Sequence, residues 1–154
     1  MARRCRARWD DLASRNRTFP MRQLKIDNID RWADSWLLEA NRAQRFEGKM
    51  LSDFYGGVLG FRNPGDRSDY TLDVQQSLTV SFVATGKNLD KCAPIDLLID
   101  GKRLKPKSRS AEKLVFGQVT LPAGSIPLSL AVAEDAKPGS DAGKVIFVKL
   151  NLEQ

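Results

Sequence analysis

The chain has 154 residues, of which 42% are hydrophobic and 29% are charged, a composition typical of a globular protein. This length suits one domain of ordinary size with an extension. No apolar run approaches the ~18 residues that span a bilayer, so we expect no membrane partner. The sequence contains no histidine, which excludes serine-histidine, cysteine-histidine and histidine-metal chemistry.

The formal charge of +6 lies in the first 25 residues, which contain eight basic and two acidic residues, whereas the remainder contains 17 of each. Nucleic-acid binding needs a basic patch on the binding fold, so we expect no nucleic-acid partner. Cys5 and Cys92 match no metal or redox spacing. The arginine-rich start has no continuous apolar core, so no signal peptide is visible.

Residues 1–37 differ in pattern from the rest of the chain. A short helix is predicted over residues 8–15, and Ile29, Trp32 and Trp36 recur at helical spacings of three and four. We interpret residues 1–37 as a basic, partly helical N-terminal extension, which is also consistent with the tail of a preceding domain. The tryptophans are expected to anchor it by packing.

From Leu38 onward the hydrophobic period changes to two, which places alternate side chains on opposite faces of a strand. Tyr70, Leu72 and Val74 share one face of a predicted strand, and residues 78–84 repeat the pattern. The pair Asp100-Gly101 predicts a tight hairpin between residues 95–99 and 102–104. Further strands are predicted at residues 114–121, 128–132 and 146–152. In the last of these, Ile146, Val148, Leu150 and Leu152 share the face expected to be buried.

About eight short strands without intervening helices predict an all-β, antiparallel β-sandwich over residues 38–154. Within it, Asn63-Pro64-Gly65-Asp66 suits a tight turn, and we expect Asp66 to bond nearby backbone amides rather than a ligand. The loops would carry any function.

Five segments in this order resemble the family 6 carbohydrate-binding modules. They are Leu38 to Asn41, residues 59–70 (LGFRNPGDRSDY), residues 78–84, residues 95–101 (IDLLIDG) and residues 119–124 (VTLPAG). The resemblance covers residues 38–154. It extends to related galactose-binding-like sandwiches at the C-termini of secreted glycoside hydrolases and sulfatases. It implies a jelly roll that binds saccharide and has no catalytic centre.

In that family an aromatic pair and an asparagine lie on loops at one end of the sandwich, where rings stack on sugar C–H faces. Phe54 and Tyr55 are similar in position to the first aromatic, whereas residues 110–114 supply no second one and Gly143 stands where the asparagine is expected. We expect charged loop residues, suited to an acidic or sulfated sugar, to replace them; the alternative is that these charges are only solvated. The resemblance and these charges imply a saccharide-contacting set of Phe54, Tyr55, Arg67, Lys113, Asp141 and Lys144.

Some members of the family hold a structural calcium ion between their first and last strands, where hard oxygen ligands suit it. Glu39 matches one ligand position, Asn41 occupies a second, and Glu153 or Asn151 would complete the site. The alternative is that these are exposed strand residues without a metal.

We therefore expect a non-catalytic domain that binds a poly- or oligosaccharide, neutral or anionic. Its parent would be a glycan-degrading protein with an upstream catalytic domain, in an extracellular or periplasmic location. The alternative is a structural sandwich that packs on a catalytic partner and binds no sugar, which the missing aromatic and asparagine favour. A glycosidase is disfavoured, because no recognisable motif pairs two carboxylates.

Overall fold

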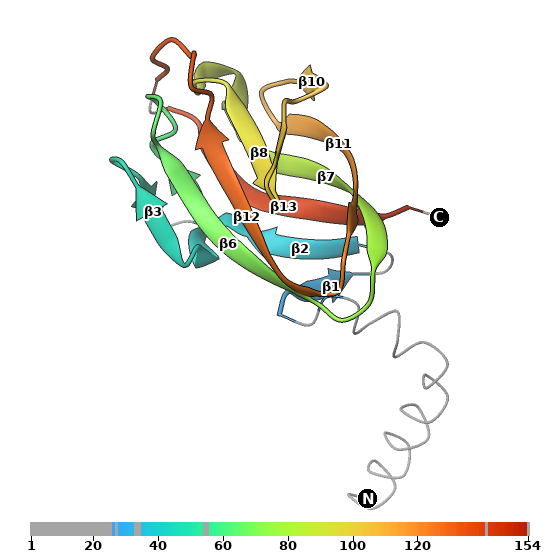
Figure 1. Cartoon of the computed structure of the whole chain (residues 1–154). Coiled ribbons are helices and arrows are strands. Elements are labelled where there is room, and N and C mark those ends of the chain that lie inside the picture. Colours follow the sequence, from blue (N-terminus) through green and yellow to red (C-terminus); the bar gives the residue numbers. More distant parts are fainter. Residues whose placement is uncertain (1–25, 27, 33–34, 54–55, 141, 154) are drawn as a thin grey trace, which may run out of the picture.

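A computed structural model describes residues 26, 28–32, 35–53, 56–140 and 142–153. These residues form two antiparallel sheets that face each other (Figure 1). The β-sandwich predicted from the hydrophobic alternation is thus confirmed. In this part of the chain no helix is both long and apolar enough to cross a membrane.

The larger sheet has eight strands in the order β1-β2-β13-β7-β11-β10, with the β4–β5 hairpin joined to β13. The smaller sheet has five strands in the order β3-β6-β12-β8-β9. The larger sheet comprises β1 (Asp30–Trp32), β2 (Ser35–Glu39), β4 (Leu51–Ser52), β5 (Val58–Leu59), β7 (Leu78–Lys87), β10 (Ser108–Arg109), β11 (Lys113–Leu121) and β13 (Lys144–Leu152). The smaller comprises β3 (Arg45–Glu47), β6 (Arg67–Val74), β8 (Ile95–Ile99), β9 (Lys102–Leu104) and β12 (Gly124–Val132).

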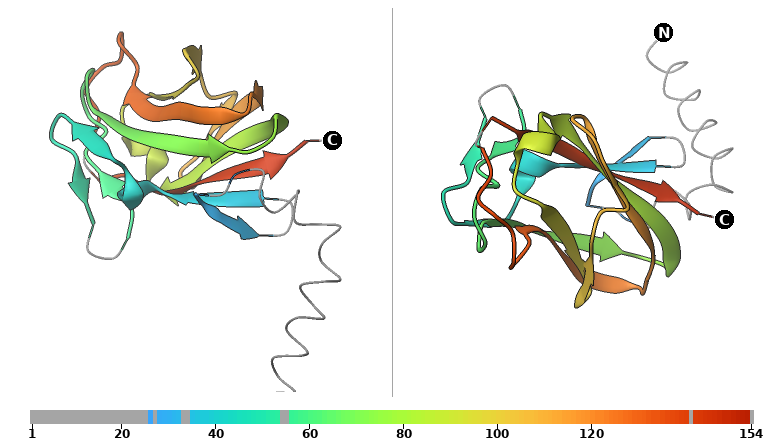
Figure 2. Two further views of the ribbon diagram at one scale, coloured as in Figure 1. Left: turned by 60° about the horizontal axis from the view of Figure 1, so that its bottom comes forward. Right: turned by 90° about the horizontal axis from the view of Figure 1, so that it is seen from above.

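Two single-turn 3-10 helices, η2 (Ala40–Arg42) and η3 (Leu89–Lys91), interrupt the strands. Figure 2 shows the sheets as two layers, with β6 (green) and β12 (orange) facing β2 (blue) and β13 (red). The core lies between them because each strand turns its apolar alternate residues inward. The largest fully buried side chains are Ile26, Trp36, Phe61, Leu72, Phe82, Leu89, Ile95, Leu97, Ile99, Leu114, Phe116 and Leu121.

The two turns predicted from local sequence are present. Asp100 and Gly101 both have positive φ, 48° and 78°, which is the two-residue hairpin geometry that joins β8 to β9. The amide of Asp66 donates to the carbonyl of Asn63 at 3.0 Å, and Gly65 has φ 97°. Local turn chemistry was therefore a reliable guide at both places.

The prediction of helical structure up to residue 37 is wrong for the described part of that segment. β1 and β2 form an antiparallel hairpin, and β2 also pairs with β13, so that Trp36 lies opposite Leu150 with no exposed surface. The Arg31 guanidinium lies 4.8 Å from the centre of the Trp36 ring. Pairing in the sheet overrides the helical spacing, and the sandwich begins before the predicted boundary at residue 38. The helix predicted for residues 8–15 lies outside the described residues.

A second correction concerns the start of β13. The pairing with β7 shifts between Val145 and Phe147, which is a β-bulge. Val145 is consequently buried where the alternation predicted Ile146, and the predicted register resumes at Val148.

The strand directions bring four connections to one end of the sandwich, which we call the loop end: the described residues among 48–66, 88–94, 105–112 and 133–143. Here β7 ends, β13 begins and Lys87 lies opposite Lys144. At the opposite end Ile26 bridges Val74, and the Glu153 amide donates to the Thr79 carbonyl at 2.9 Å. Both ends of the described chain therefore lie away from the loop end.

Candidate functional site

A buried carboxylate holds the first loop of the loop end. Asp66 is 6% exposed, and its Oδ2 atom accepts hydrogen bonds from the amides of Arg62 (3.1 Å) and Asn63 (2.8 Å). The predicted structural role of Asp66 is thus confirmed, and its carboxylate is not directed to a ligand.

A guanidinium fastens the next two loops to each other. Arg109, on β10, donates to the carbonyls of Leu89 (3.1 Å), Asp90 (2.9 Å) and Cys92. Burial raises the pKa of the Cys92 thiol to about 11, although the nearby Arg109 charge opposes the shift. The thiol is therefore protonated at neutral pH and is not a nucleophile.

An ion pair joins the β4–β5 hairpin to β13. Lys144 Nζ lies 2.7 Å from Asp53 Oδ2, and the two side chains are only 15% and 22% exposed. Lys144, which the sequence predicted to contact saccharide, is therefore engaged within the protein.

The two other described residues of the predicted saccharide-contacting set lie on different sheets. Arg67 bonds Asp69 at 2.9 Å on the outer face of the smaller sheet, whereas Lys113 is exposed on the outer face of the larger sheet, opposite Thr85. Phe54, Tyr55 and Asp141 lie outside the described residues. The structure thus separates Arg67 from Lys113.

A pocket of about 340 Å³, which we call the hairpin pocket, lies beside the β4–β5 hairpin. It is lined by Leu37, Glu39, Asn41, Gly56, Gly57, Ile146 and Phe147. Gly57 has φ 93°, and a Cβ there would lie 2.8 Å from the Val145 carbonyl oxygen, so only glycine fits this approach to β13. The pocket combines an aromatic ring, a carboxylate and a carboxamide beside the two glycines.

The predicted calcium ligands do not come together. Glu39 lies opposite Phe147 on β13, so Glu153 is six residues further along, about 20 Å at ~3.3 Å per residue. Glu39 Oε2 is moreover 3.0 Å from Arg42 Nε. Among the described residues no three His, Cys, Asp or Glu side chains form a metal-binding group. The set of Glu39, Asn41 and Glu153 therefore does not fit a single ion.

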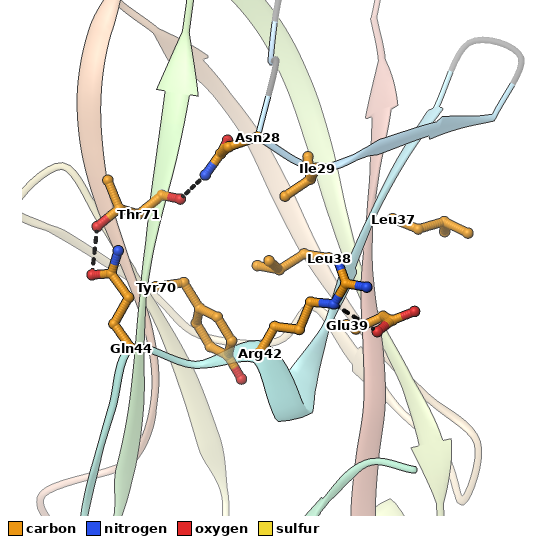
Figure 3. A pocket seen from close by; sticks show the side chains of 9 residues that line it. All are labelled: Asn28, Ile29, Leu37, Leu38, Glu39, Arg42, Gln44, Tyr70 and Thr71. Carbon is orange, nitrogen blue, oxygen red and sulfur yellow. Dashed lines mark hydrogen bonds and ion pairs between the residues drawn. The ribbon is translucent and has the colours of Figure 1, made fainter.

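A second pocket of about 160 Å³, the edge pocket, opens between β2, η2 and β6 (Figure 3). Its lining residues are Asn28, Ile29, Leu37, Leu38, Glu39, Arg42, Gln44, Tyr70 and Thr71. The Tyr70 hydroxyl donates to the Ala40 carbonyl at 2.6 Å, and burial raises the pKa of Tyr70 to about 12. This bond fixes η2 against β6 at the pocket floor.

The Asn28 side chain supports the rim of the edge pocket. Its amide donates to the Thr71 carbonyl (2.6 Å) and its oxygen accepts from the Asp73 amide (2.9 Å), which imitates a strand pairing with β6. Sequence reasoning missed Asn28, Arg42 and Gln44 as pocket residues. No local pattern marks them, because they meet only after the two sheets have packed.

Family models and curated protein sequences give no match to the chain. Solved structures do match, and all three described here are at most 21% identical to the chain, so they bear on the fold alone. The first is the β-(1,4)-mannanase of Podospora anserina that carries a CBM35 module, with TM-score 0.60 and 12% identity. It is matched over 79% of this chain, which spans 28% of the mannanase chain.

Two isolated carbohydrate-binding modules are matched over almost their whole length. CBM35 from Cellvibrio japonicus Abf62 has TM-score 0.52 and 14% identity, over 75% of this chain and 91% of the module. The CBM36-1 domain of a multidomain xylanase from the hindgut metagenome of Trinervitermes trinervoides has TM-score 0.52 and 21% identity, over 78% of this chain and 98% of the domain. The chain thus has the jelly-roll fold of carbohydrate-binding modules, and these likenesses do not single out the predicted family 6.

Proposed function

We propose that this chain is a non-catalytic carbohydrate-binding domain of a larger, exported glycan-degrading protein. The observation that carries the proposal is the likeness to two isolated carbohydrate-binding modules over more than nine tenths of each module. Its location would be extracellular or periplasmic, and its catalytic partner would be a domain of the same parent protein.

The proposed binding surface is centred on the hairpin pocket. Phe54 and Tyr55 would supply stacking rings, as the sequence resemblance implies, and Phe147 adds an aromatic ring to the pocket wall. Glu39 and Asn41 provide oxygen and amide groups for sugar hydroxyls. Apolar lining with a few polar groups is the usual composition of a small-ligand site.

Two exposed lysines on the outer face of the larger sheet favour a preference for acidic saccharides. Lys113 lies opposite Thr85, and Lys87 follows two residues later on the same face. Diagonal neighbours of this kind are about 7–8 Å apart, close enough for both ammonium groups to meet one carboxylate or sulfate. Lys144 does not contribute, because Asp53 neutralises it.

Affinity electrophoresis would test the proposal with β-1,4-mannan, β-1,4-xylan, β-1,3-galactan and polygalacturonate. We expect at least one polysaccharide to retard the protein. A Phe54→Ala/Tyr55→Ala variant should bind at least about tenfold more weakly, since each aromatic ring that packs on a sugar contributes on the order of 1 kcal/mol. For an acidic ligand, Lys113→Ala should weaken binding, whereas Lys102→Ala, an exposed lysine at the opposite end, should not. An unchanged thermal midpoint would show that each variant is folded.

The second candidate function is a sandwich that packs on a catalytic partner and binds no sugar. The observation in its favour is that Arg67 and Lys144 are engaged by Asp69 and Asp53. If no polysaccharide retards the wild-type protein, and a partner domain co-purifies with it at fixed stoichiometry, this second function replaces the first.

A further inference from the structure

The hairpin pocket and the edge pocket share part of their lining, and we call the surface formed there by Glu39 and Arg42 the ridge. Leu37 and Glu39 line both pockets, and the consecutive η2 residues Asn41 and Arg42 divide between them, one to each. We propose that the two pockets are adjacent subsites of one groove across β2, and that the ligand is a linear oligosaccharide of at least two units. This inference rests on the proposed carbohydrate-binding function and goes beyond the loop residues that the sequence indicated.

The volumes of the pockets favour a shared ligand. Small-molecule sites usually measure about 300–1,000 Å³. The edge pocket, at about 160 Å³, is too small for such a ligand alone, and the hairpin pocket, at about 340 Å³, is at the lower limit. Taken together they fall well inside the range, as expected for a groove that is filled by successive sugar units.

The ridge carries an acceptor and a donor side by side. Arg42 Nε lies 3.0 Å from Glu39 Oε2, with side-chain exposures of 66% and 49% (Figure 3). The guanidinium has five N–H donors and the carboxylate several acceptor positions, so both groups can bond further hydroxyls. Neighbouring hydroxyls of a pyranose present a donor and an acceptor at similar spacing, which matches this pair.

The walls on both sides suit the C–H faces of sugar rings. In the edge pocket, Ile29 and Leu38 stand beside the buried Tyr70 ring, and in the hairpin pocket Phe147 takes that place. Gln44 accepts from the Thr71 hydroxyl at 2.9 Å through its oxygen, and its amide nitrogen supplies a donor at the rim.

The groove fits other ligand classes less well. Glu39 and Arg42 cancel each other's charge, so the ridge offers no uncompensated cation for a phosphate. A peptide strand would need a long open edge on β2, but β1 already pairs with Ser35 to Leu37 and leaves only two residues. A chain of neutral sugar units needs neither an uncompensated cation nor an open strand edge. Any acidic group of the ligand would lie further along, towards Lys113.

The test uses the full chain and calorimetric titration with defined sugars. For the polysaccharide that retards the protein, the series from monosaccharide to tetrasaccharide is titrated, for example xylose to xylotetraose or mannose to mannotetraose. We expect the dissociation constant to fall roughly tenfold or more between one unit and two or three units, since a second subsite adds its own contacts.

The ridge is tested with Arg42→Ala and Glu39→Gln, which should each weaken oligosaccharide binding about tenfold, the effect of losing a charge-assisted hydrogen bond. An exposed ion pair adds little to folding stability, so both variants should keep the wild-type thermal midpoint. The matched control is Arg45→Ala, because Arg45 is also 66% exposed and paired, with Glu47, but lines neither pocket.

Three outcomes decide between the proposals. Loss of affinity in the ridge variants, with Arg45→Ala unchanged and a dependence on chain length, supports the groove. If the ridge variants bind as wild type and affinity is independent of chain length, while Phe54→Ala/Tyr55→Ala abolishes binding, the groove is overturned and the carbohydrate-binding function stands. A wild-type protein that binds none of the polysaccharides overturns both.

Discussion

At Asp66 one carboxylate oxygen accepts two backbone amides that the turn cannot satisfy internally. Arg109 and Lys144 have the same structural role. The Arg109 guanidinium donates to three backbone carbonyls, and Lys144 forms an ion pair with Asp53. These polar side chains hold the loop end in shape and are not available to a ligand. The groups proposed for recognition are others: those on the ridge, those beside the hairpin, and Lys113 with Lys87.

Replacement of Asp66 by alanine should lower the free energy of unfolding by about 2 kcal/mol, because two buried amides lose their acceptor. Chemical denaturation would measure the effect. Asp73→Ala is the control, since Asp73 lies on the next strand with an exposed side chain. Equal stability of the two variants would contradict the structural role of Asp66.

At the scale of elements, the β1–β2 hairpin is part of the sandwich core rather than a peripheral extension. Trp36 has no exposed surface, and β2 stands between β1 and β13 in the larger sheet. Ile26 also bridges β6 in the smaller sheet, and Asn28 bonds two backbone groups of that strand. The segment from residue 26 to residue 39 therefore closes one side of the sandwich.

Truncated chains would test whether the folded domain includes the β1–β2 hairpin or begins at residue 38, as the sequence predicted. A chain that starts at Ile26 keeps the β1–β2 hairpin and Trp36 and should unfold cooperatively. A chain that starts at Leu38 loses Trp36 and two strands, and because removal of one large buried aromatic alone costs about 3–5 kcal/mol, it should not fold. Circular dichroism melting curves of both chains would show the difference, and a cooperative transition in the shorter chain would refute the assignment.

For the molecule as a whole, features set by neighbouring residues were predicted from the sequence, whereas features set by contacts between distant segments were not. Alternation in β6, β7 and β12 and the turns at Gly65 and Gly101 were sufficient to predict a β-sandwich from the sequence. The β1–β2 hairpin was missed because its residues also fit a helical period, and the pairing with β13 that decides between them is not local. The edge pocket was missed for the same reason, since β2, η2 and β6 supply its walls from separate parts of the chain.

Global stability should depend on pH in the alkaline range. Burial raises the pKa of Tyr70 from 10.0 to about 12 and that of Cys92 from 9.0 to about 11. Both groups stay protonated in the folded state while the unfolded chain releases their protons, so their contribution is complete below pH 9 and is lost as the pH rises towards 12.

Between pH 8 and 10.5 the wild-type protein should lose roughly 3 kcal/mol more unfolding free energy than a Tyr70→Phe/Cys92→Ala variant. Urea titrations at a series of pH values would measure both slopes. The double variant is less stable at pH 8 because Tyr70 no longer bonds Ala40, so the comparison concerns the slopes alone. Parallel slopes would show that neither group is buried as described.

Ile26 and Glu153 both lie at the end of the sandwich opposite to the loops. A catalytic domain joined after Glu153 would be attached at this end, so its bulk would not cover the hairpin pocket. Binding of the pocket to an insoluble glycan would then restrict the enzyme to a small volume around the anchoring point, and linker length would set the effective concentration of cleavable bonds. The positions of Ile26 and Glu153 thus leave the loop end accessible to a large glycan.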